Sequence, residues 1–286
     1  MRCGTRVVVA TVATLALLGC GSDPDPDPGT TGGPSTVSAR APDSTEAYLP
    51  GLEADLYLPA GNPGSAPVVV LVPGGGWTSA DRAGLGPLAA SLAAAGNVAV
   101  NATYRVAPAA RFPQPVSDVV CAADYGAARA ARAGIAPTRV VLLGHSAGAH
   151  LAALGTLAPA HFRAECPWPA RNVDGLVGLA GAYDLTGLAD VVQPLFGATP
   201  RQQPERWREG TPSSWVGQRT PSPPVLLAHG ELDDVVAVPQ SRDFGAALTG
   251  AGHDVELEIL PDADHDTIYR PEVVADLIAR WLAGLG

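Results

Sequence analysis

The fold of this chain is decided by the stretch VVLLGHSAGAHLAAL, residues 140–154. The apolar run 140–143 is typical of a buried parallel strand, and the alanine-rich run 149–154 indicates a helix. Between them lies a Gly-x-Ser-x-Gly turn centred on Ser146. A serine on such a turn takes a positive φ at a cost of about 1–3 kcal/mol, and the flanking glycines leave room for the turn.

This turn gives the hydroxyl group of Ser146 a chemical role. The turn lifts the side chain above the sheet, and the following helix directs N–H groups and a partial positive charge toward it. A chance Gly-x-Ser-x-Gly is the alternative in a chain with 33 glycines. The strand before the turn and the helix after it argue against chance, so we predict that Ser146 is a nucleophile.

A nucleophilic serine needs a base, and the base needs an orienting carboxylate. His265 follows the last predicted strand and precedes the last predicted helix. Asp233 and Asp234 follow the preceding strand, and we favour Asp233. The carboxyl ends of parallel strands meet at one edge of a sheet, where active sites collect. The sequence therefore predicts a catalytic triad of Ser146, Asp233 and His265.

A glycine loop, residues 73–77, follows another predicted strand and reads Pro-Gly-Gly-Gly-Trp. Glycines let a backbone approach a ligand closely. We predict that the N–H groups near Gly75 and Gly76 join that of Ala147 in an oxyanion hole, where each donor lowers the barrier by about 3–4 kcal/mol. A merely flexible loop is the alternative, and the position after a buried strand argues against it.

Short apolar runs alternate with helical stretches from about residue 45 onward. The predicted strands are 52–58, 67–72, 98–103, 139–143, 173–180, 225–229 and 255–260. The predicted helices are 85–95, 116–132, 147–157, 240–249 and 271–282. Such alternation predicts an α/β fold with a mostly parallel central sheet of about eight strands and helices on both faces. The irregular segment 185–224 is long for a connection, which favours a cap or a pocket wall.

Four segments resemble those of one enzyme superfamily. They are Gly74–Trp77, Gly144–His150, Gly181–Leu185 and His229–Asp233. From about residue 45 the chain resembles the α/β-hydrolase superfamily, and within it the bacterial esterases related to hormone-sensitive lipase and kynurenine formamidase. The chain order of Ser146, Asp233 and His265 is also the order in that superfamily. One departure is Pro73, which stands where the loop usually has a histidine that braces it through side-chain hydrogen bonds.

The resemblance implies a carboxylesterase that cleaves a small to medium ester through an acyl-enzyme on Ser146. His265 would take the serine proton and return it to the leaving group, while Asp233 holds the imidazole. No metal or cofactor is implied. Two alternatives stay open: an amide hydrolase of the formamidase or peptidase type, and a non-catalytic surface-binding protein on the same fold. The likeness to kynurenine formamidase favours the first alternative, and the complete triad argues against the second.

Several aromatic side chains are candidates for contact with a substrate. Trp77 and Tyr183 are the predicted substrate-binding residues. Core packing is an equal expectation for Trp77, as it is for Trp207 and Trp215, and a structural role is an equal expectation for Tyr183.

Two histidines lie close to the predicted nucleophile. His145 precedes Ser146, and His150 follows it by one helical turn. We expect them to form hydrogen bonds behind the site. A metal site is not predicted, because no further residue has the spacing to complete a ligand set.

The composition excludes several functions. A formal net charge of −10 repels phosphate, so nucleic acid is not an expected partner. All 18 basic residues are arginine, which excludes a lysine Schiff base and a P-loop lysine. A length of 286 residues, 47% of them hydrophobic, fits one large domain. Nothing in the sequence indicates the oligomeric state.

The N-terminal residues differ from the rest of the chain. The apolar run 7–18 is too short to span a bilayer comfortably. Residues 1–19 resemble a bacterial lipoprotein signal peptide, which implies an acylated Cys20 at the head of a disordered Pro/Asp/Gly-rich tether, residues 20–44. We therefore predict that the catalytic domain, 45–286, is exported and lipid-anchored to the outer face of the bacterial cell membrane, or secreted. A weak transmembrane anchor and an ordinary signal peptide are the alternatives.

Cys121 and Cys166 are the cysteines left for the domain, because Cys3 leaves with the signal peptide and Cys20 carries the lipid. Disulfides persist in exported proteins, so we predict a bridge between the two. Two buried free thiols are the alternative. The separation of the two residues along the chain does not fit the spacing of metal ligands.

Overall fold

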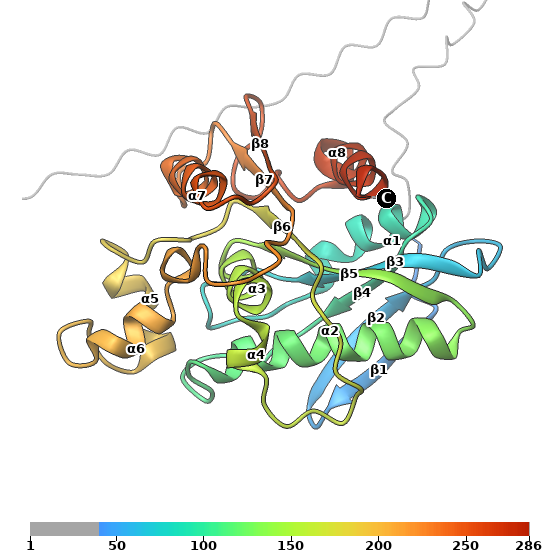
Figure 1. Cartoon of the computed structure of the whole chain (residues 1–286), viewed down its shortest axis with the longest axis horizontal. Coiled ribbons are helices and arrows are strands. Elements are labelled where there is room, and N and C mark those ends of the chain that lie inside the picture. The colour runs from blue at the N-terminus through green and yellow to red at the C-terminus, as the bar shows by residue number, and fades with distance from the viewer. Residues whose placement is uncertain (1–39, 286) are drawn as a thin grey trace, which may run out of the picture. The chain divides into compact units, whose positions relative to one another are not determined.

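The computed structural model describes residues 40–285. The predicted signal peptide, Cys20 and all but the end of the predicted tether lie outside the described residues. The strands are β1 (Ser44–Leu49), β2 (Leu52–Tyr57), β3 (Ser65–Val72), β4 (Val98–Ala102), β5 (Ala136–His145), β6 (Gly175–Leu179), β7 (Val225–Gly230) and β8 (Val255–Leu260). They form one sheet in the order β1-β2-β4-β3-β5-β6-β7-β8 (Figure 1). The pairs β1–β2 and β2–β4 are antiparallel, and every other pair is parallel.

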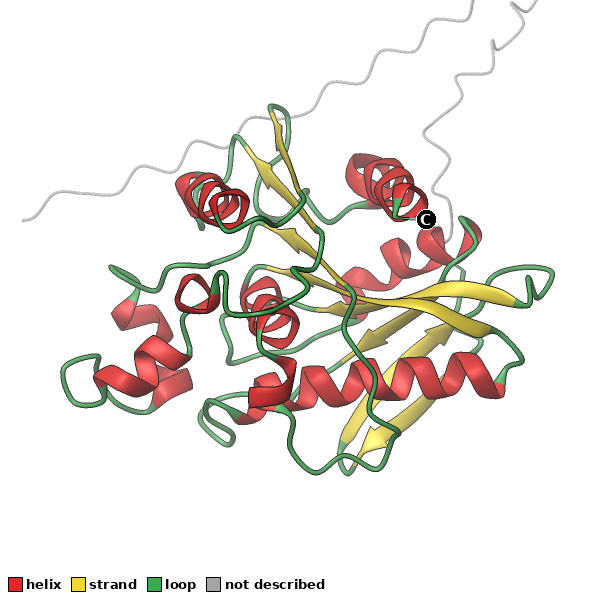
Figure 2. Cartoon of the chain, viewed as in Figure 1, coloured by secondary structure: helices red, strands yellow, loops and turns green. Residues whose placement is uncertain are grey.

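Helices cover both faces of the sheet (Figure 2). The α-helices are α1 (Gly86–Ala94), α2 (Gln114–Arg132), α3 (Ala147–Leu157), α4 (Pro159–Phe162), α5 (Ala189–Phe196), α6 (Pro204–Glu209), α7 (Pro239–Gly250) and α8 (Pro271–Gly284). Two 3-10 helices, η1 (Ala83–Leu85) and η2 (Pro212–Trp215), complete the described elements. Within residues 40–285, no helix has the length and apolar character needed to cross a membrane.

Strand β3 illustrates how the sequence builds the two cores. Val68, Val70 and Val72 pack with α2 and α3 on one face. Val69 and Leu71 pack with α1 and α8 on the other face. Alternate side chains of a strand point to opposite faces, so a continuous apolar run is needed where both faces are covered.

The predicted α/β fold with a mostly parallel sheet of about eight strands is confirmed. The sequence does not predict β1, because only Tyr48 in it is buried, while its other side chains are exposed or half-buried at the edge of the sheet and give a weak apolar signal. Its start, Ser44, falls within the predicted tether. The residues just before it also belong to this edge: Asp43 accepts a hydrogen bond of 2.7 Å from the amide of Leu58.

The irregular segment 185–224 contains α5, α6 and η2. In Figure 1, α5 and α6 stand at the left, out from the sheet. The amide of Phe112 donates to the carbonyl oxygen of Leu195 at 2.9 Å, which ties α5 to the chain before α2. Trp207 is buried against Phe196, with the ring centroids 4.2 Å apart. Segment 185–224 therefore contains an apolar contact between two of its own side chains.

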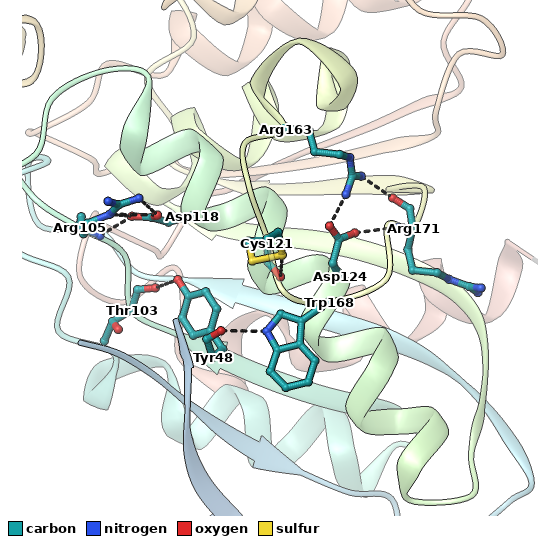
Figure 3. Close-up of a disulfide and its surroundings, with 10 residues drawn as sticks. Tyr48, Thr103, Arg105, Asp118, Cys121, Asp124, Arg163, Trp168 and Arg171 are labelled. Atoms are coloured by element: carbon teal, nitrogen blue, oxygen red, sulfur yellow. Dashed lines mark hydrogen bonds and ion pairs between the residues drawn. A yellow bond between two sulfur atoms is a disulfide. The ribbon is translucent and has the colours of Figure 1, made fainter. Parts of the chain in front are cut away.

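A disulfide joins Cys121 in α2 to Cys166 in the chain between α4 and β6 (Figure 3). The same stretch is held at two further points. The indole of Trp168 donates to the carbonyl oxygen of Tyr48 in β1 at 2.8 Å. Buried Asp124 of α2 forms an ion pair with Arg163. The stretch between α4 and β6 is thus fixed to α2 and to the edge strand.

Candidate active site

Ser146 lies between β5 and α3 with φ 53° and ψ −121°. Its amide donates to the carbonyl oxygen of Leu179 in β6 at 2.9 Å. A Cβ on Gly144 would lie 2.3 Å from the carbonyl oxygen of Gly148, and a Cβ on Gly148 would lie 2.1 Å from that of Val72. The sharp turn therefore requires glycine at both positions.

His265 follows β8 and reaches Ser146 across the edge of the sheet. Its Nε2 lies 3.0 Å from Oγ of Ser146, and its Nδ1 lies 2.8 Å from Oδ2 of Asp233. Because a carboxylate only accepts, Nδ1 carries the proton and Nε2 is left to accept from the serine hydroxyl. The three predicted side chains thus form one hydrogen-bonded chain. Asp234, the alternative acid, is exposed.

The carboxylate of Asp233 has no exposed side-chain surface and is surrounded by donors. The amides of Val235 and Val236 donate to its Oδ1 at 2.9 and 2.8 Å. Burial alone would raise the pKa of Asp233, but the hydrogen bonds from His265 and from these amides outweigh it and lower the pKa. The group is therefore ionised whenever His265 is able to act as a base.

His229, at the end of β7, is a further residue of the site that the sequence did not mark. Its Nδ1 lies 2.7 Å from Oγ of Ser241, and its Nε2 lies 2.8 Å from the carbonyl oxygen of Val236 and 3.2 Å from Oδ2 of Asp233. Burial lowers the pKa of His229, so the ring stays neutral. It fixes the loop that carries Asp233. The only signal in the sequence is its place in the His229–Asp233 segment.

The glycine loop (73–77) lies against the nucleophile turn. A Cβ on Gly74 would lie 2.9 Å from Nδ1 of His145 and 3.1 Å from Cβ of Ser146. Gly75 and Gly76 take φ values of 119° and 57°, and Trp77 takes 59°. These positive values make a tight bend that only glycine adopts easily. The bend brings the loop backbone beside the serine.

The bend of the glycine loop is held from inside the protein. The carbonyl oxygen of Gly75 accepts from the amides of Thr78 and Ser79 at 3.1 and 3.0 Å. The hydroxyl of buried Tyr104 lies 3.1 Å from the carbonyl oxygen of Pro73 and 3.3 Å from that of Ser79. Tyr104 thus braces both ends of the bend through backbone groups. No local sequence pattern pointed to Tyr104.

His145 packs behind the base. Its Nε2 donates to the backbone carbonyl of His265 at 2.9 Å, and its ring lies 4.8 Å from that of His265 and 4.6 Å from that of Tyr269. Burial, helped by the neighbouring His265, lowers the pKa of His145 to about 4. A neutral His145 therefore fixes the backbone of the base.

A cavity of about 250 Å³ lies next to His145, between the glycine loop and the chain after the base. It is lined by Pro73, Gly74, Gly75, Ser79, Asp81, Gly84, Leu85, His145, Asp266 and Tyr269. Two carboxylates, those of Asp81 and Asp266, are among its polar side chains. It adjoins the site and offers room for part of a substrate.

The two predicted substrate-binding side chains are both buried. Trp77 is 4% exposed, and its indole hydrogen-bonds to His150. Tyr183 is fully buried and stacks on Phe244 with the ring centroids 4.2 Å apart. Burial favours packing over the predicted contact with a substrate for both. Within the described residues, no group of three or more His, Cys, Asp or Glu side chains is placed to hold a metal ion.

The chain matches the model of a known protein family. The model of the BD-FAE family matches residues 54–248. Among curated proteins, the esterase LipC of Mycobacterium tuberculosis is 34% identical over 214 residues, which cover 70% of this chain and 53% of that protein. The isoprenylcysteine alpha-carbonyl methylesterase ICME of Arabidopsis thaliana is 30% identical over 235 residues, covering 75% and 54%. The chain spans about half the length of these relatives.

Solved structures share the fold over most of their length. A truncated carbohydrate esterase from gut microbiota superposes with a TM-score of 0.73 at 20% identity, covering 81% of this chain and 90% of that one. Esterase 2 of Thermogutta terrifontis, phosphorylated by paraoxon, superposes with a TM-score of 0.67 at 25% identity, covering 84% and 91%.

The family match and the fold agree. The matched range is more than half of the chain and contains Ser146 and Asp233. The sheet and the helices on its two faces are those of the structural neighbours. The chain therefore belongs to the BD-FAE family and has the α/β-hydrolase fold.

Proposed function

We propose that the protein is a serine carboxylesterase that cleaves small to medium carboxylic esters through an acyl-enzyme on Ser146. One observation carries the proposal: His265 lies within hydrogen-bond distance of both the serine hydroxyl, at 3.0 Å, and the buried carboxylate of Asp233, at 2.8 Å. The curated relatives support it, since the two named above are described as esterases.

The reaction follows from these contacts. Oγ of Ser146 attacks the ester carbonyl carbon while Nε2 of His265 takes the hydroxyl proton. The proton then passes to the leaving alkoxide oxygen, and an alcohol departs. Water attacks the acyl-serine with His265 again as the base, and the acid leaves. Asp233 stabilises the imidazolium that forms in both halves of the reaction.

The negative charge of the tetrahedral intermediate needs donors. We assign this role to the amides of Gly75 and Gly76 in the glycine loop and to the amide of Ala147 at the first turn of α3. The close approach of Gly74 to Ser146 supports the assignment, because it brings the loop backbone to the nucleophile. The N-terminus of α3 adds a partial positive charge on the same side.

Hydrolysis of p-nitrophenyl esters tests the proposal. The parent protein should release p-nitrophenol from the acetate and butyrate esters, and Ser146→Ala should not. A fluorophosphonate probe should label the parent and leave Ser146→Ala unlabelled, in line with the phosphorylation of the Thermogutta enzyme by paraoxon. Equal turnover by parent and variant would refute the assignment. A panel of formamides and peptide amides beside the esters decides between ester and amide cleavage.

We also propose export with a lipid anchor: a signal peptide at 1–19, acylation of Cys20 and a tether that leads to the catalytic domain at 45–286. The disulfide between Cys121 and Cys166 supports an oxidising compartment. In a bacterial host, the parent should partition with membranes and incorporate labelled palmitate. Cys20→Ala should abolish the label, whereas Cys3→Ala should retain it. Palmitate incorporation by Cys20→Ala would contradict the proposal.

A further inference from the structure

His150 lies on α3, one helical turn after Ser146, and its side chain is completely buried. Its Nδ1 lies 3.1 Å from the indole Nε1 of Trp77. Its Nε2 lies 2.7 Å from the backbone carbonyl of Gly210. The two partners are 73 and 60 residues away along the chain. One imidazole therefore contacts the glycine loop and segment 185–224 at once.

These contacts allow only one protonation state of the ring. The indole N–H of Trp77 donates and never accepts, so Nδ1 of His150 is the acceptor. The carbonyl of Gly210 only accepts, so Nε2 carries the proton. Burial lowers the pKa of His150 to about 4, which keeps the ring neutral. Both ring nitrogens are thus satisfied by a single neutral tautomer.

Trp77 needs such a partner because of where it stands. It is the last residue of the glycine loop and has a φ of 59°, which is unusual for a side chain of its size. Its ring meets that of His150 edge to face, with the centroids 5.3 Å apart. Its carbonyl oxygen accepts from the amide of Ala107 at 2.9 Å. His150 therefore holds the ring of Trp77, and Ala107 holds its backbone.

The far partner of His150 is also fixed. Gly210 directly follows α6, and its amide donates to the carbonyl oxygen of Arg206 at 3.0 Å. A Cβ on Gly210 would lie 2.4 Å from the ring of Phe196, so the backbone packs closely there. The next residue, Thr211, donates through its hydroxyl to the carbonyl oxygen of Trp207. His150 is consequently anchored to a packed part of segment 185–224.

We propose that His150 is a positioning residue of the reaction. It holds the side chain of Trp77, and through Trp77 it keeps the amides of Gly75 and Gly76 within hydrogen-bond distance of the oxyanion that forms when Ser146 attacks. The inference rests on the proposed function. Oxyanion donors act over a narrow range of about 2.7–3.1 Å, and a glycine-rich bend has many other conformations open to it. Tyr104 braces the ends of the bend, whereas His150 braces the side chain that closes it.

Two substitutions separate the two hydrogen bonds of His150. His150→Asn places a side-chain oxygen near the Nδ1 position and retains the acceptor for Trp77. His150→Gln places its amide nitrogen near the Nε2 position and retains only the donor for Gly210. Trp77→Phe removes the indole donor from the other side. His161→Gln, at an exposed histidine of α4, is the matched control.

We expect kcat for p-nitrophenyl butyrate to fall by about 10- to 100-fold in His150→Gln and in Trp77→Phe, because an oxyanion donor is displaced rather than deleted. KM should change less than about threefold, because ground-state binding does not use the donors. His150→Asn should keep kcat within about fivefold of the parent, and His161→Gln should match the parent.

Inhibition by butylboronic acid provides the readout that a structural role would not move. The boronate adduct on Ser146 carries a tetrahedral negative charge and uses the same donors as the transition state. Its inhibition constant should rise in His150→Gln and Trp77→Phe by a factor similar to the fall in kcat.

The parent and Ser146→Ala are measured alongside, so that the two proposals fail separately. If the parent is active and Ser146→Ala is not, but His150→Gln and Trp77→Phe keep the kcat and boronate affinity of the parent, only the positioning role is rejected. The same conclusion follows if His150→Asn loses as much kcat as His150→Gln. An inactive parent rejects the esterase proposal and the positioning role with it.

Discussion

The side chain of Asp233 contacts more hydrogen-bonding groups than the side chain of Ser146 or of His265. Two backbone amides, His229 and His265 all point at its carboxylate, and its side chain has no exposed surface. The neighbouring Asp234 is exposed. Adjacent acids therefore sit in opposite surroundings, and only one of them is able to orient the imidazole.

This contrast gives a matched pair of substitutions. We expect Asp233→Asn to lower kcat by about 10⁴-fold, because an amide does not stabilise the imidazolium and favours the wrong tautomer of His265. Asp234→Asn should leave kcat within about twofold, since an exposed side chain away from the base contributes little. Kinetics on a p-nitrophenyl ester check both. A large loss in Asp234→Asn with a small loss in Asp233→Asn would reverse the assignment.

At the scale of elements, the turn between β5 and α3 depends on backbone contact. A Cβ on Gly148 would lie 2.1 Å from the carbonyl oxygen of Val72 in β3, and backbone has no rotamer by which to move aside. Gly250, at the end of α7, has open space around its Cβ position.

We therefore expect Gly148→Ala to lower the free energy of unfolding by about 3 kcal/mol or more, or to prevent folding. Gly250→Ala should change it by less than about 1 kcal/mol. Urea denaturation followed by circular dichroism measures both. If Gly148→Ala and the parent have similar urea midpoints, the prediction is wrong, because β3 and the turn can then move apart to make room for the methyl group.

The disulfide between Cys121 and Cys166 is the other feature that connects elements. It closes a loop of 45 residues that spans the nucleophile turn and α3. We expect the double variant Cys121→Ser/Cys166→Ser to lose about 2–4 kcal/mol of the free energy of unfolding, because a cross-link restricts the unfolded chain. Its kcat should stay close to that of the parent, since neither cysteine contacts the triad. Dithiothreitol should destabilise the parent and leave the double variant unchanged; sensitivity of the double variant would argue against the disulfide as the cause.

At the scale of the whole molecule, acid stability follows from the three buried histidines whose pKa is lowered by burial: His145, His150 and His229. Burial lowers the pKa of both His145 and His150 to about 4, whereas an unfolded histidine titrates near 6.5. Between these pH values the histidines are protonated in the unfolded chain but not in the folded protein. The free energy of unfolding therefore falls as the pH falls. His145 and His150 each account for a loss on the order of 3 kcal/mol, and His229 adds to the loss in the same direction. Below that window, protonation of Asp233 removes the stability that its lowered pKa contributes.

Thermal unfolding between pH 8 and pH 4 tests this account. The Tm of the parent should fall as the pH drops from about 6.5 to about 4. His150→Gln removes one of these three groups, so its Tm should fall less over the same interval, even though it starts lower. His161→Gln should fall as steeply as the parent. A parent Tm that stays level across the interval would contradict the burial argument.

The sequence by itself determined the order along the chain of β2 to β8 and of the longer helices, and the identity of the three side chains at the strand ends. Such features are local: apolar periodicity shows which segments are buried strands, and the glycines beside Ser146 show where a sharp turn is possible. The carboxyl edge of a parallel sheet then brings residues 146, 233 and 265 together whatever the details of packing.

Only the tertiary structure decided which groups support that site. His150, His229 and Tyr104 act through hydrogen bonds whose partners depend on how separate elements pack, and no local pattern encodes such a match. The same reason explains β1, whose weak alternation becomes a strand only beside β2, and the burial of Trp77 and Tyr183. Whether a side chain is buried in the core or lines a pocket depends on which segments pack over it, and those segments are distant along the chain.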